Sequence, residues 1–160
     1  MPTAPAVPTS ATQPNVGFHL TQPAGWVSQP ADTQHQIAAI FTAPESDPAE
    51  NNTFRANINI TITPNNEDLA ETVAQTEQEY PHYLPDYRSV SDEPVTLASG
   101  RAARLIGGTY DSADSGPLRN LQLLVENAGN LYVVTATTTA TSYDRYEGIV
   151  RSSLLTFTLT

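Results

Sequence analysis

The clearest pattern in the chain is an alternation of apolar and polar residues from position 54 to position 62. The apolar positions are Phe54, Ala56, Ile58, Ile60 and Ile62. Successive side chains of a strand point to opposite faces of its sheet, so a period of two predicts a strand with one buried face and one face in water. We therefore expect the three isoleucines to lie in the core together with Phe54.

Shorter apolar runs, separated by Pro, Gly and Asn, predict further strands. They cover residues 18–21, 36–42, 95–98, 101–110, 118–126, 131–139 and 156–159. The runs 118–126 and 131–139 flank Asn127-Ala-Gly129-Asn130, and Gly and Asn tolerate left-handed backbone conformations. These two runs are therefore expected to form a hairpin, and strands paired as hairpins make an antiparallel sheet.

Two segments have the spacing of helices instead. The first opens with Asn65 or Asn66 as its expected cap. Glu67 and Asp68 follow in the first turn, where the helix dipole favours anions, and Pro81 is expected to end this helix. The apolar stripe of this helix consists of Leu69, Val73, Thr76 and Tyr80. The second helix is expected to begin near residue 141 or 142. Its apolar stripe consists of Tyr143, Tyr146, Val150, Leu154 and Phe157. Helices against a mainly antiparallel sheet predict an α+β fold, an antiparallel β-sheet flanked by helices.

Length and local composition suggest one domain with a tail. A chain of 160 residues is about one domain, and residues 17–160 are expected to form it. Residues 1–16 are rich in Pro, Thr and Ala and carry no charge, so they are expected to be a disordered tether that cannot offset its ordering entropy. No signal-peptide pattern is visible, and no apolar run is long enough to span a membrane, so direct membrane insertion is not expected.

Charge and missing residue types exclude several functions. The chain has 17 Asp and Glu against seven Arg and no Lys, for a net charge of −10. It offers no basic stripe to nucleic acid or to an anionic membrane. The absence of Cys excludes disulfides and thiolate chemistry, and the absence of Lys excludes Schiff bases. Residues 1–80 contain many acidic side chains but only one Arg, Arg55. This half of the chain therefore either faces a basic partner or forms a solvated acidic surface.

Residues that could catalyse a reaction or bind a metal lack the required patterns. His19, His35 and His82 are not spaced as a metal-binding pair, and Asp111 and Asp114 do not have the spacing of a calcium loop. No G-x-S-x-G motif is present. The sequence therefore predicts that the protein is not an enzyme and has no metal or cofactor.

Three groups of residues, in this order along the chain, form a recognisable set. They are Phe18, Pro23, Gly25 and Trp26 at the start, Gly100, Gly108 and Tyr110 in the middle, and Leu131, Tyr132 and Phe157 near the end. The set covers about residues 17–159 and resembles the bacterial PsbP-like families of the Mog/PsbP superfamily. That superfamily includes photosystem II extrinsic proteins, LpqN-type lipoproteins, DcrB-like envelope proteins and secretion-effector chaperones. Among these, the chain resembles LpqN-type or related bacterial lipoproteins best.

The resemblance implies an α/β/α sandwich and a non-enzymatic binding or assembly scaffold. It also implies a place outside the cytoplasm, either anchored to the cell envelope through a segment ahead of Met1 or secreted, with the cytoplasm as the alternative. The expected partner is an unidentified protein, membrane-associated or not, and a monomer is expected rather than an oligomer. Since one fold serves unrelated roles, this route to function is an analogy.

The segment from residue 79 to 87 is the strongest candidate for a binding surface. Its candidate binding residues are Tyr80, His82, Tyr83 and Tyr87. Tyr offers a large rigid area with a polar tip, and Pro81 and Pro85 restrict the backbone in advance, which lowers the ordering cost of association. Alternatively, the rings fold onto the sheet and hold the helix. A protein partner would meet this loop or the sheet face, and the alternative function is a small-ligand or lipid-binding module with a cleft between sheet and helix.

Overall fold

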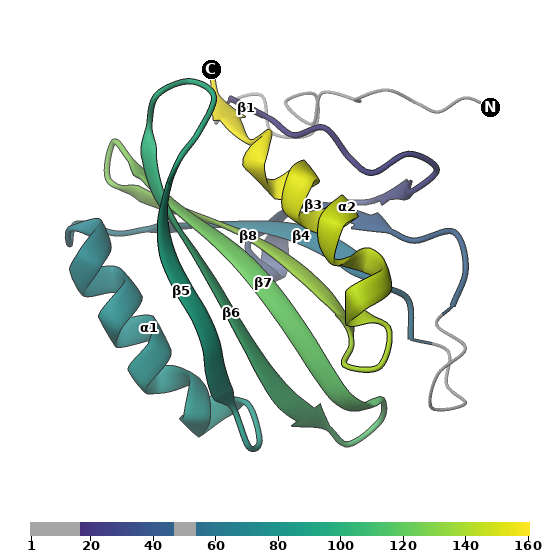
Figure 1. Cartoon of the computed structure of the whole chain (residues 1–160). Coiled ribbons are helices and arrows are strands. Elements are labelled where there is room, and N and C mark those ends of the chain that lie inside the picture. The colour runs from purple at the N-terminus through teal and green to yellow at the C-terminus, as the bar shows by residue number, and fades with distance from the viewer. Residues whose placement is uncertain (1–16, 47–53) are drawn as a thin grey trace.

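The computed structural model describes residues 17–46 and 54–160, so the predicted tether at 1–16 lies outside the described residues. Figure 1 shows the elements in chain order. They are β1 (Phe18–His19), β2 (Val27–Gln29), the 3-10 helix η2 (Thr33–His35), β3 (Ile37–Thr42), β4 (Asn57–Pro64), α1 (Leu69–Tyr83), β5 (Arg88–Thr96), β6 (Ala102–Ser112), β7 (Gly116–Asn127), β8 (Asn130–Thr139), α2 (Tyr143–Leu155) and β9 (Thr158–Leu159).

One sheet of seven strands dominates the structure. Its order is β2-β3-β4-β8-β7-β6-β5, and every neighbouring pair is antiparallel. Strands β7 and β8 form the predicted hairpin, with Asn127 opposite Asn130. Strand β1 pairs with β9 in a separate ribbon. The predicted α+β class is confirmed.

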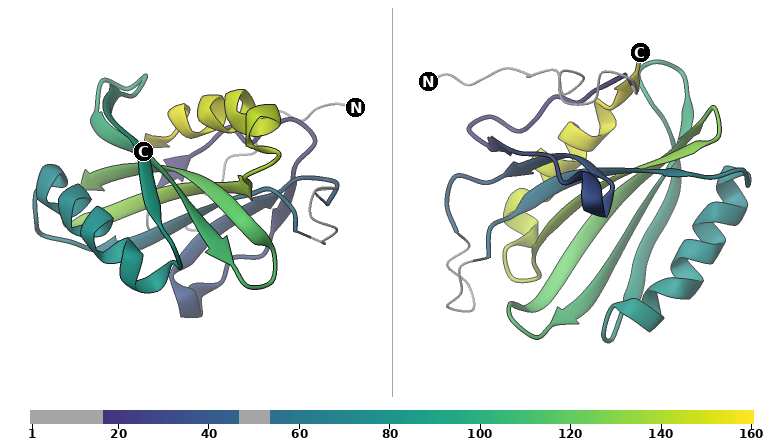
Figure 2. Two further views of the ribbon diagram at one scale, coloured as in Figure 1. Left: turned by 60° about the horizontal axis from the view of Figure 1, so that its bottom comes forward. Right: turned by 180° about the vertical axis from the view of Figure 1, so that it is seen from behind.

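The two helices cover opposite faces of this sheet, as the left-hand view of Figure 2 shows. Successive residues of a strand point to opposite sides. In β6, Leu105 belongs to the core beneath α2, whereas Ile106 packs with Val73 of α1. In β7, Leu123 and Leu124 divide in the same way. The result is the α/β/α sandwich implied by the resemblance.

The larger core lies between the sheet and α2. Ile58 and Ile60 are fully buried in it, and Ile62 packs against it while half-buried. Phe54 is half-buried and precedes the first residue of β4. The predicted buried face is confirmed for Ile58 and Ile60 and in part for Ile62, whereas Phe54 lies before the strand and is only half-buried.

Aromatic residues of the recognised set close this core where the two ends of the domain meet. Phe18 stacks on Phe157 with 5.9 Å between ring centroids, and Tyr132 packs against the same Phe157 ring at 5.8 Å. Trp26 meets Tyr146 of α2 edge to face at 6.0 Å. These buried rings come from β1, β8, α2 and the residues just before β2 and β9, so the structure places them in the core.

The first helix begins later than predicted. Its cap is Asp68, whose carboxylate accepts a hydrogen bond from the Glu71 N–H at 2.8 Å, and neither Asn65 nor Asn66 caps it. The Asn65 N–H donates to the Gly129 carbonyl at 2.8 Å, which keeps this residue in line with β4 and beside the β7–β8 hairpin. The expected cap was wrong because a long-range backbone hydrogen bond holds Asn65 outside the helix.

The same helix also ends later than predicted, because α1 continues through Pro81 to Tyr83. Pro81 lies in the last turn, where its missing N–H removes one intrahelical hydrogen bond, and the Leu84 N–H still donates to the Tyr80 carbonyl at 2.8 Å. Strand β5 was largely missed, since it begins at Arg88 rather than residue 95. It is an edge strand, exposed at most positions, so it tolerates polar residues and Pro94.

Candidate functional site

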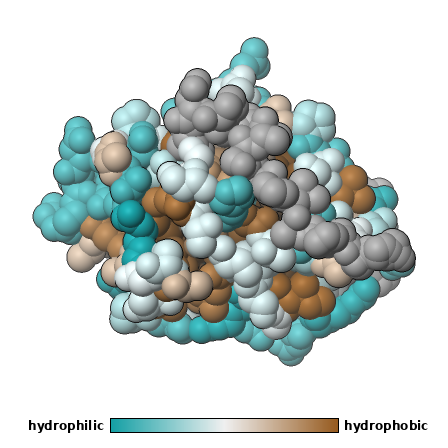
Figure 3. Space-filling view, turned by 90° about the horizontal axis from the view of Figure 1, so that it is seen from above, coloured by the Kyte–Doolittle hydropathy of each residue, from teal (hydrophilic) through white to brown (hydrophobic). Residues whose placement is uncertain are grey.

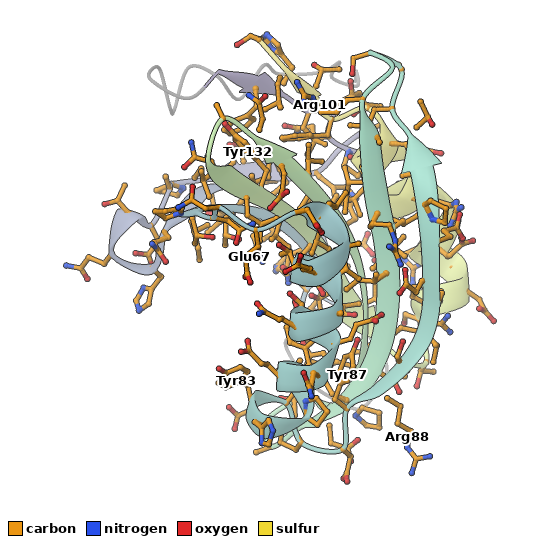
Figure 4. The ribbon with its side chains drawn as sticks, turned by 90° about the vertical axis from the view of Figure 1, so that its left-hand side faces the viewer. Glu67, Tyr83, Tyr87, Arg88, Arg101 and Tyr132 are labelled. Carbon is orange, nitrogen blue, oxygen red and sulfur yellow. The ribbon has the colours of Figure 1, made fainter. Side chains whose placement is uncertain are left out.

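The four predicted binding residues do not share a loop. Tyr80, His82 and Tyr83 lie in the last turns of α1, and Tyr87 lies in the turn that leads to β5. Tyr87 is 9% exposed, whereas Tyr83 is 70% exposed, and His82 is exposed as well. Figure 4 shows Tyr83 and Tyr87 on different sides of the end of α1. The prediction of one exposed aromatic loop is therefore wrong, because the helix separates a buried ring pair from an exposed ring.

Tyr80 and Tyr87 form the buried pair. Their rings pack edge to face, with centroids 5.1 Å apart. The Tyr87 ring lies over Gly108 of β6, where any Cβ would collide with it. Burial, followed by the nearby Tyr80, Glu77 and Asp92, raises the pKa of Tyr87 to about 12, and burial also raises the pKa of Tyr80. Both rings stay neutral and hold the end of α1 on the sheet.

Beside this pair, charged side chains from three elements meet at the contact between α1 and the sheet. They are Glu77 of α1, Asp92 of β5 and Arg104 of β6. The Arg104 Nε donates to Asp92 Oδ1 at 3.1 Å, and a terminal guanidinium nitrogen contacts the same oxygen. Burial, and then the charge and hydrogen bond of Asp92, raise the pKa of Glu77, whose Oε2 is buried without a hydrogen-bond partner. We call these three residues the carboxyl cluster.

At the other end of the same contact, α1 and the sheet leave an apolar groove of about 450 Å³. Because the chain reverses between α1 and β5, the start of the helix lies beside the end of the strand. The groove is lined by Leu69, Ala70, Pro94, Val95, Thr96, Ala102, Ala103 and Arg104. Most of this lining is apolar, so the groove suits an apolar group, with one guanidinium at its edge.

Strand β5 is the last strand of the sheet, and within the described residues no further strand pairs with its outer side. The register shifts between Ser89 and Ser91, and Val90 between them is 47% exposed. Tyr83 is exposed at the C-terminal end of α1, which precedes the start of β5 in the chain. We call the groove, the outer side of β5, Tyr83 and Val90 together the α1–β5 surface.

The solvent side of α1 adds negative charge to this surface. Four exposed acidic residues at and before the helix, with no basic residue among them, are Glu67, Asp68, Glu71 and Glu79. The Asp68 carboxylate, together with Glu67, raises the pKa of Glu71, which indicates a negative local potential. The surface therefore combines an apolar groove with an acidic helix.

The carboxyl cluster was not predicted from the sequence, and the groove was foreseen only as the alternative of a cleft between sheet and helix, without its lining residues. Glu77 stands four residues after Val73 and three before Tyr80, so it lies on the apolar stripe of the helix. A carboxyl group on such a stripe was the available signal. Asp92 and Arg104 carried no comparable signal, because only the pairing of β5 with β6 brings them together.

A second, polar depression of about 380 Å³ lies at the start of α1, where Figure 4 labels Glu67 and Arg101. Its polar groups bind one another, since Arg101 donates to the Glu126 carbonyl at 3.2 Å and the Asn65 amide contacts the Glu126 carboxylate. Viewed from the end that carries the C-terminus, the coloured surface shows hydrophobic residues in separate patches among hydrophilic ones (Figure 3). The depression is lined mainly by polar residues, whereas the groove is mostly apolar, so the groove remains the candidate site for an apolar group.

Within residues 17–46 and 54–160, no three His, Asp or Glu side chains are placed to hold a metal ion. No helix there is long and apolar enough to cross a membrane.

Comparison with known proteins places the chain in a family. The family model described as DcrB matches residues 19–156. No curated protein matches the chain.

Three solved structures have a similar fold. PA94 of Pseudomonas aeruginosa, a protein of unknown function and putative regulator, is 22% identical, with 73% of this chain and 78% of that chain covered at a TM-score of 0.63. The cyanobacterial PsbP protein CyanoP of Synechocystis sp. PCC 6803 is 12% identical, with 89% of this chain and 86% of that chain covered at a TM-score of 0.62. LpqN, involved in cell envelope biogenesis of Mycobacterium tuberculosis, is 16% identical, with 100% of this chain and 86% of that chain covered at a TM-score of 0.62.

These identities show a shared fold. The predicted resemblance to PsbP-like and DcrB-like proteins is confirmed by the fold and by the family model together. Since that model spans most of the chain, the protein belongs to the DcrB family.

Proposed function

We propose that this DcrB-family protein is a non-catalytic, extracytoplasmic binding module of the cell envelope that holds a protein partner on its α1–β5 surface. Similarity to LpqN, which is involved in cell envelope biogenesis, supports the location. The observation that carries the choice of surface is the apolar groove of about 450 Å³ between α1 and the sheet edge. Its volume is in the range of pockets that take small apolar groups.

The partner is expected to dock by side chains rather than by adding a strand to β5. Pro94 has no N–H to donate, and the charged Asp92 and Glu93 lie on the same edge strand. Proteins protect sheet edges from strand addition with such residues. An apolar side chain in the groove and a second contact on Tyr83 are the mode that this edge favours.

The partner segment is further expected to carry Lys or Arg beside its apolar anchor. Glu71 and Glu79 are exposed on α1, and Asp68 and Glu67 precede them. Opposite charges accelerate encounter and fix the orientation of a complex, and salt screens them. Binding should therefore weaken as the salt concentration rises.

The test replaces Ala70, an exposed helix residue that lines the groove, with Arg. Ala70→Arg fills the groove and adds a second positive charge to that of Arg104, while Arg is a good helix former. Ile149→Arg is the matched control, because Ile149 is 47% exposed on α2, on the opposite side of the sheet. Cross-linking in intact cells, followed by quantitative mass spectrometry, compares the envelope proteins bound to each variant.

Loss of the captured envelope proteins in Ala70→Arg but not in Ile149→Arg would support the surface, and a parallel loss in Tyr83→Ser would extend it to the end of α1. The reverse pattern would place the partner on α2 and overturn the proposal. The groove volume also favours a small apolar ligand as the second candidate. NMR titration with a soluble fatty acid tests this, since groove residues alone should shift.

A further inference from the structure

Helix α1 is anchored to the sheet by few apolar side chains. Val73 is the one fully buried apolar residue in the described helix α1, and it packs against Ile106 of β6 and Leu124 of β7. Leu69 and Tyr80 are only partly buried. Helix α2, by contrast, buries Tyr143, Tyr146, Val150 and Leu154. Since segments with little buried apolar area open most readily, α1 is the less firmly held helix.

The carboxyl cluster supplies the charged part of this attachment. The groups that face Glu77 are Asp92 and Ser89 of β5, Arg104 of β6 and Tyr87 in the turn. Arg104 is already engaged by Asp92, and Tyr87 Oη is buried without a hydrogen-bond partner, as is Glu77 Oε2. The cluster therefore contains two carboxyl groups and one cation, so one carboxylate has no matching positive charge.

Protonation of Glu77 removes this mismatch. An ionised Glu77 places a second negative charge next to Asp92 and leaves a buried oxygen without a donor, which is costly away from water. A neutral Glu77 carries a proton that it can donate to the Asp92 carboxylate across the contact between α1 and β5. The attachment of α1 is therefore stronger with Glu77 neutral than with Glu77 ionised.

We infer that α1 is a lid over the apolar residues of β6, β7 and β8, and that the carboxyl cluster is a latch which a proton on Glu77 closes. This inference rests on the proposed function, because it concerns access to the α1–β5 surface. Leu69 links the two, since it lines the groove and also packs against the cluster of Val73, Ile106 and Leu124. Lifting α1 extends the groove into this apolar cluster, and the partly buried Leu131 and Val133 lie beside it.

The direction of the pH effect follows from the raised pKa of Glu77. A carboxyl whose pKa is higher in the folded state contributes stability that is fully present below its ordinary value of 4.5. This contribution is lost as the pH rises through the raised value. The latch is thus closed in acid and loosened toward neutral pH, by up to about tenfold in the opening equilibrium for each unit by which the pKa is raised.

The test is native-state amide exchange, measured by NMR on the full chain without a partner from about pH 4 to pH 8 and corrected for intrinsic rates. In the wild type, amides of α1 should open more often as the pH rises, while amides in the middle of β4 keep their protection. Glu77→Gln, a neutral side chain of the same shape, should remove the part of this pH dependence that comes from the carboxyl cluster and keep the amides around residue 77 close to their acid level of protection, whereas Glu71 at the start of the helix contributes separately. Glu79→Gln, exposed on the same helix, is the control and should keep the wild-type pH dependence.

Opening of α1 that does not change with pH in the wild type would overturn the latch. So would a pH dependence around residue 77 that survives unchanged in Glu77→Gln, whether or not it changes in Glu79→Gln. Because no partner is present, this experiment stands apart from the capture experiment on Ala70→Arg. A working latch with unchanged capture would reject the proposed surface alone, and a failed latch with lost capture would reject the lid alone.

Discussion

The end of α1 is held by a contact that a single methyl group should break. Gly108 lies in β6 directly beneath the Tyr87 ring, and a Cβ at this position would collide with ring atoms Cε1 and Cζ and with the hydroxyl oxygen. The Tyr87 ring cannot simply retreat, because the Tyr80 ring packs against it at 5.1 Å. Overpacking of this kind typically costs about 1–3 kcal/mol, so we expect Gly108→Ala to lower the free energy of unfolding by about that amount.

A double-mutant cycle makes this expectation specific. Tyr87→Ala alone should cost about 3–5 kcal/mol, as for other buried aromatic side chains, and it opens the space that a Cβ at residue 108 needs. In the double variant Gly108→Ala should therefore cost little, with a coupling of about 1–3 kcal/mol. Urea unfolding followed by circular dichroism measures the four stabilities, with the m-value as a check on two-state behaviour. A neutral Gly108→Ala, or the same cost with and without the Tyr87 ring, would show that the ring does not lie on Gly108.

Two further substitutions test the sheet and α2. Ile60→Ala should destabilise by about 2–5 kcal/mol because Ile60 is fully buried, whereas Asn59→Ala on the other, half-exposed face should be nearly neutral; equal effects in chemical denaturation would mean that the register of β4 is misassigned. Gly148→Ala should stabilise by about 0.5–1 kcal/mol, since Gly148 lies within α2 with open space around its Cα, and a lower melting temperature would contradict this.

The elements that the sequence predicts well are those whose pattern repeats over many residues. The alternation around Ile58 and Ile60 predicts β4, and the runs on either side of Gly129 predict the β7–β8 hairpin. In β4 the face that meets the core is set by the strand's own period of two, and in the hairpin the turn residues join two neighbouring runs, so neither prediction needs knowledge of distant residues. The stripe through Tyr146 and Val150 predicts the buried side of α2 for the same reason.

The boundaries of α1 and the start of β5 illustrate where local patterns mislead. Asn65 is a good capping residue, but its N–H binds the Gly129 carbonyl, and Asp68 takes the cap. Pro81 commonly ends a helix, but here α1 continues for two more residues, to Tyr83. The first part of β5 has no apolar alternation because an edge strand buries little of its surface. The outcomes at Asn65 and in β5 depend on partners that are distant in sequence.

For the candidate site, too, some properties follow from the sequence alone and others follow only from tertiary contacts. The sequence by itself determined that the segment from Tyr80 to Tyr87 is rich in aromatic rings, that the chain is acidic and that no cysteine or lysine chemistry is available. Only the tertiary structure decided that Tyr87 packs on Gly108 while Tyr83 stays in water, and that the Glu77 carboxyl meets Asp92. The physical reason is that exposure and pKa depend on which groups the sheet brings within a few ångströms, and strand pairing sets this between residues that no short-range pattern connects.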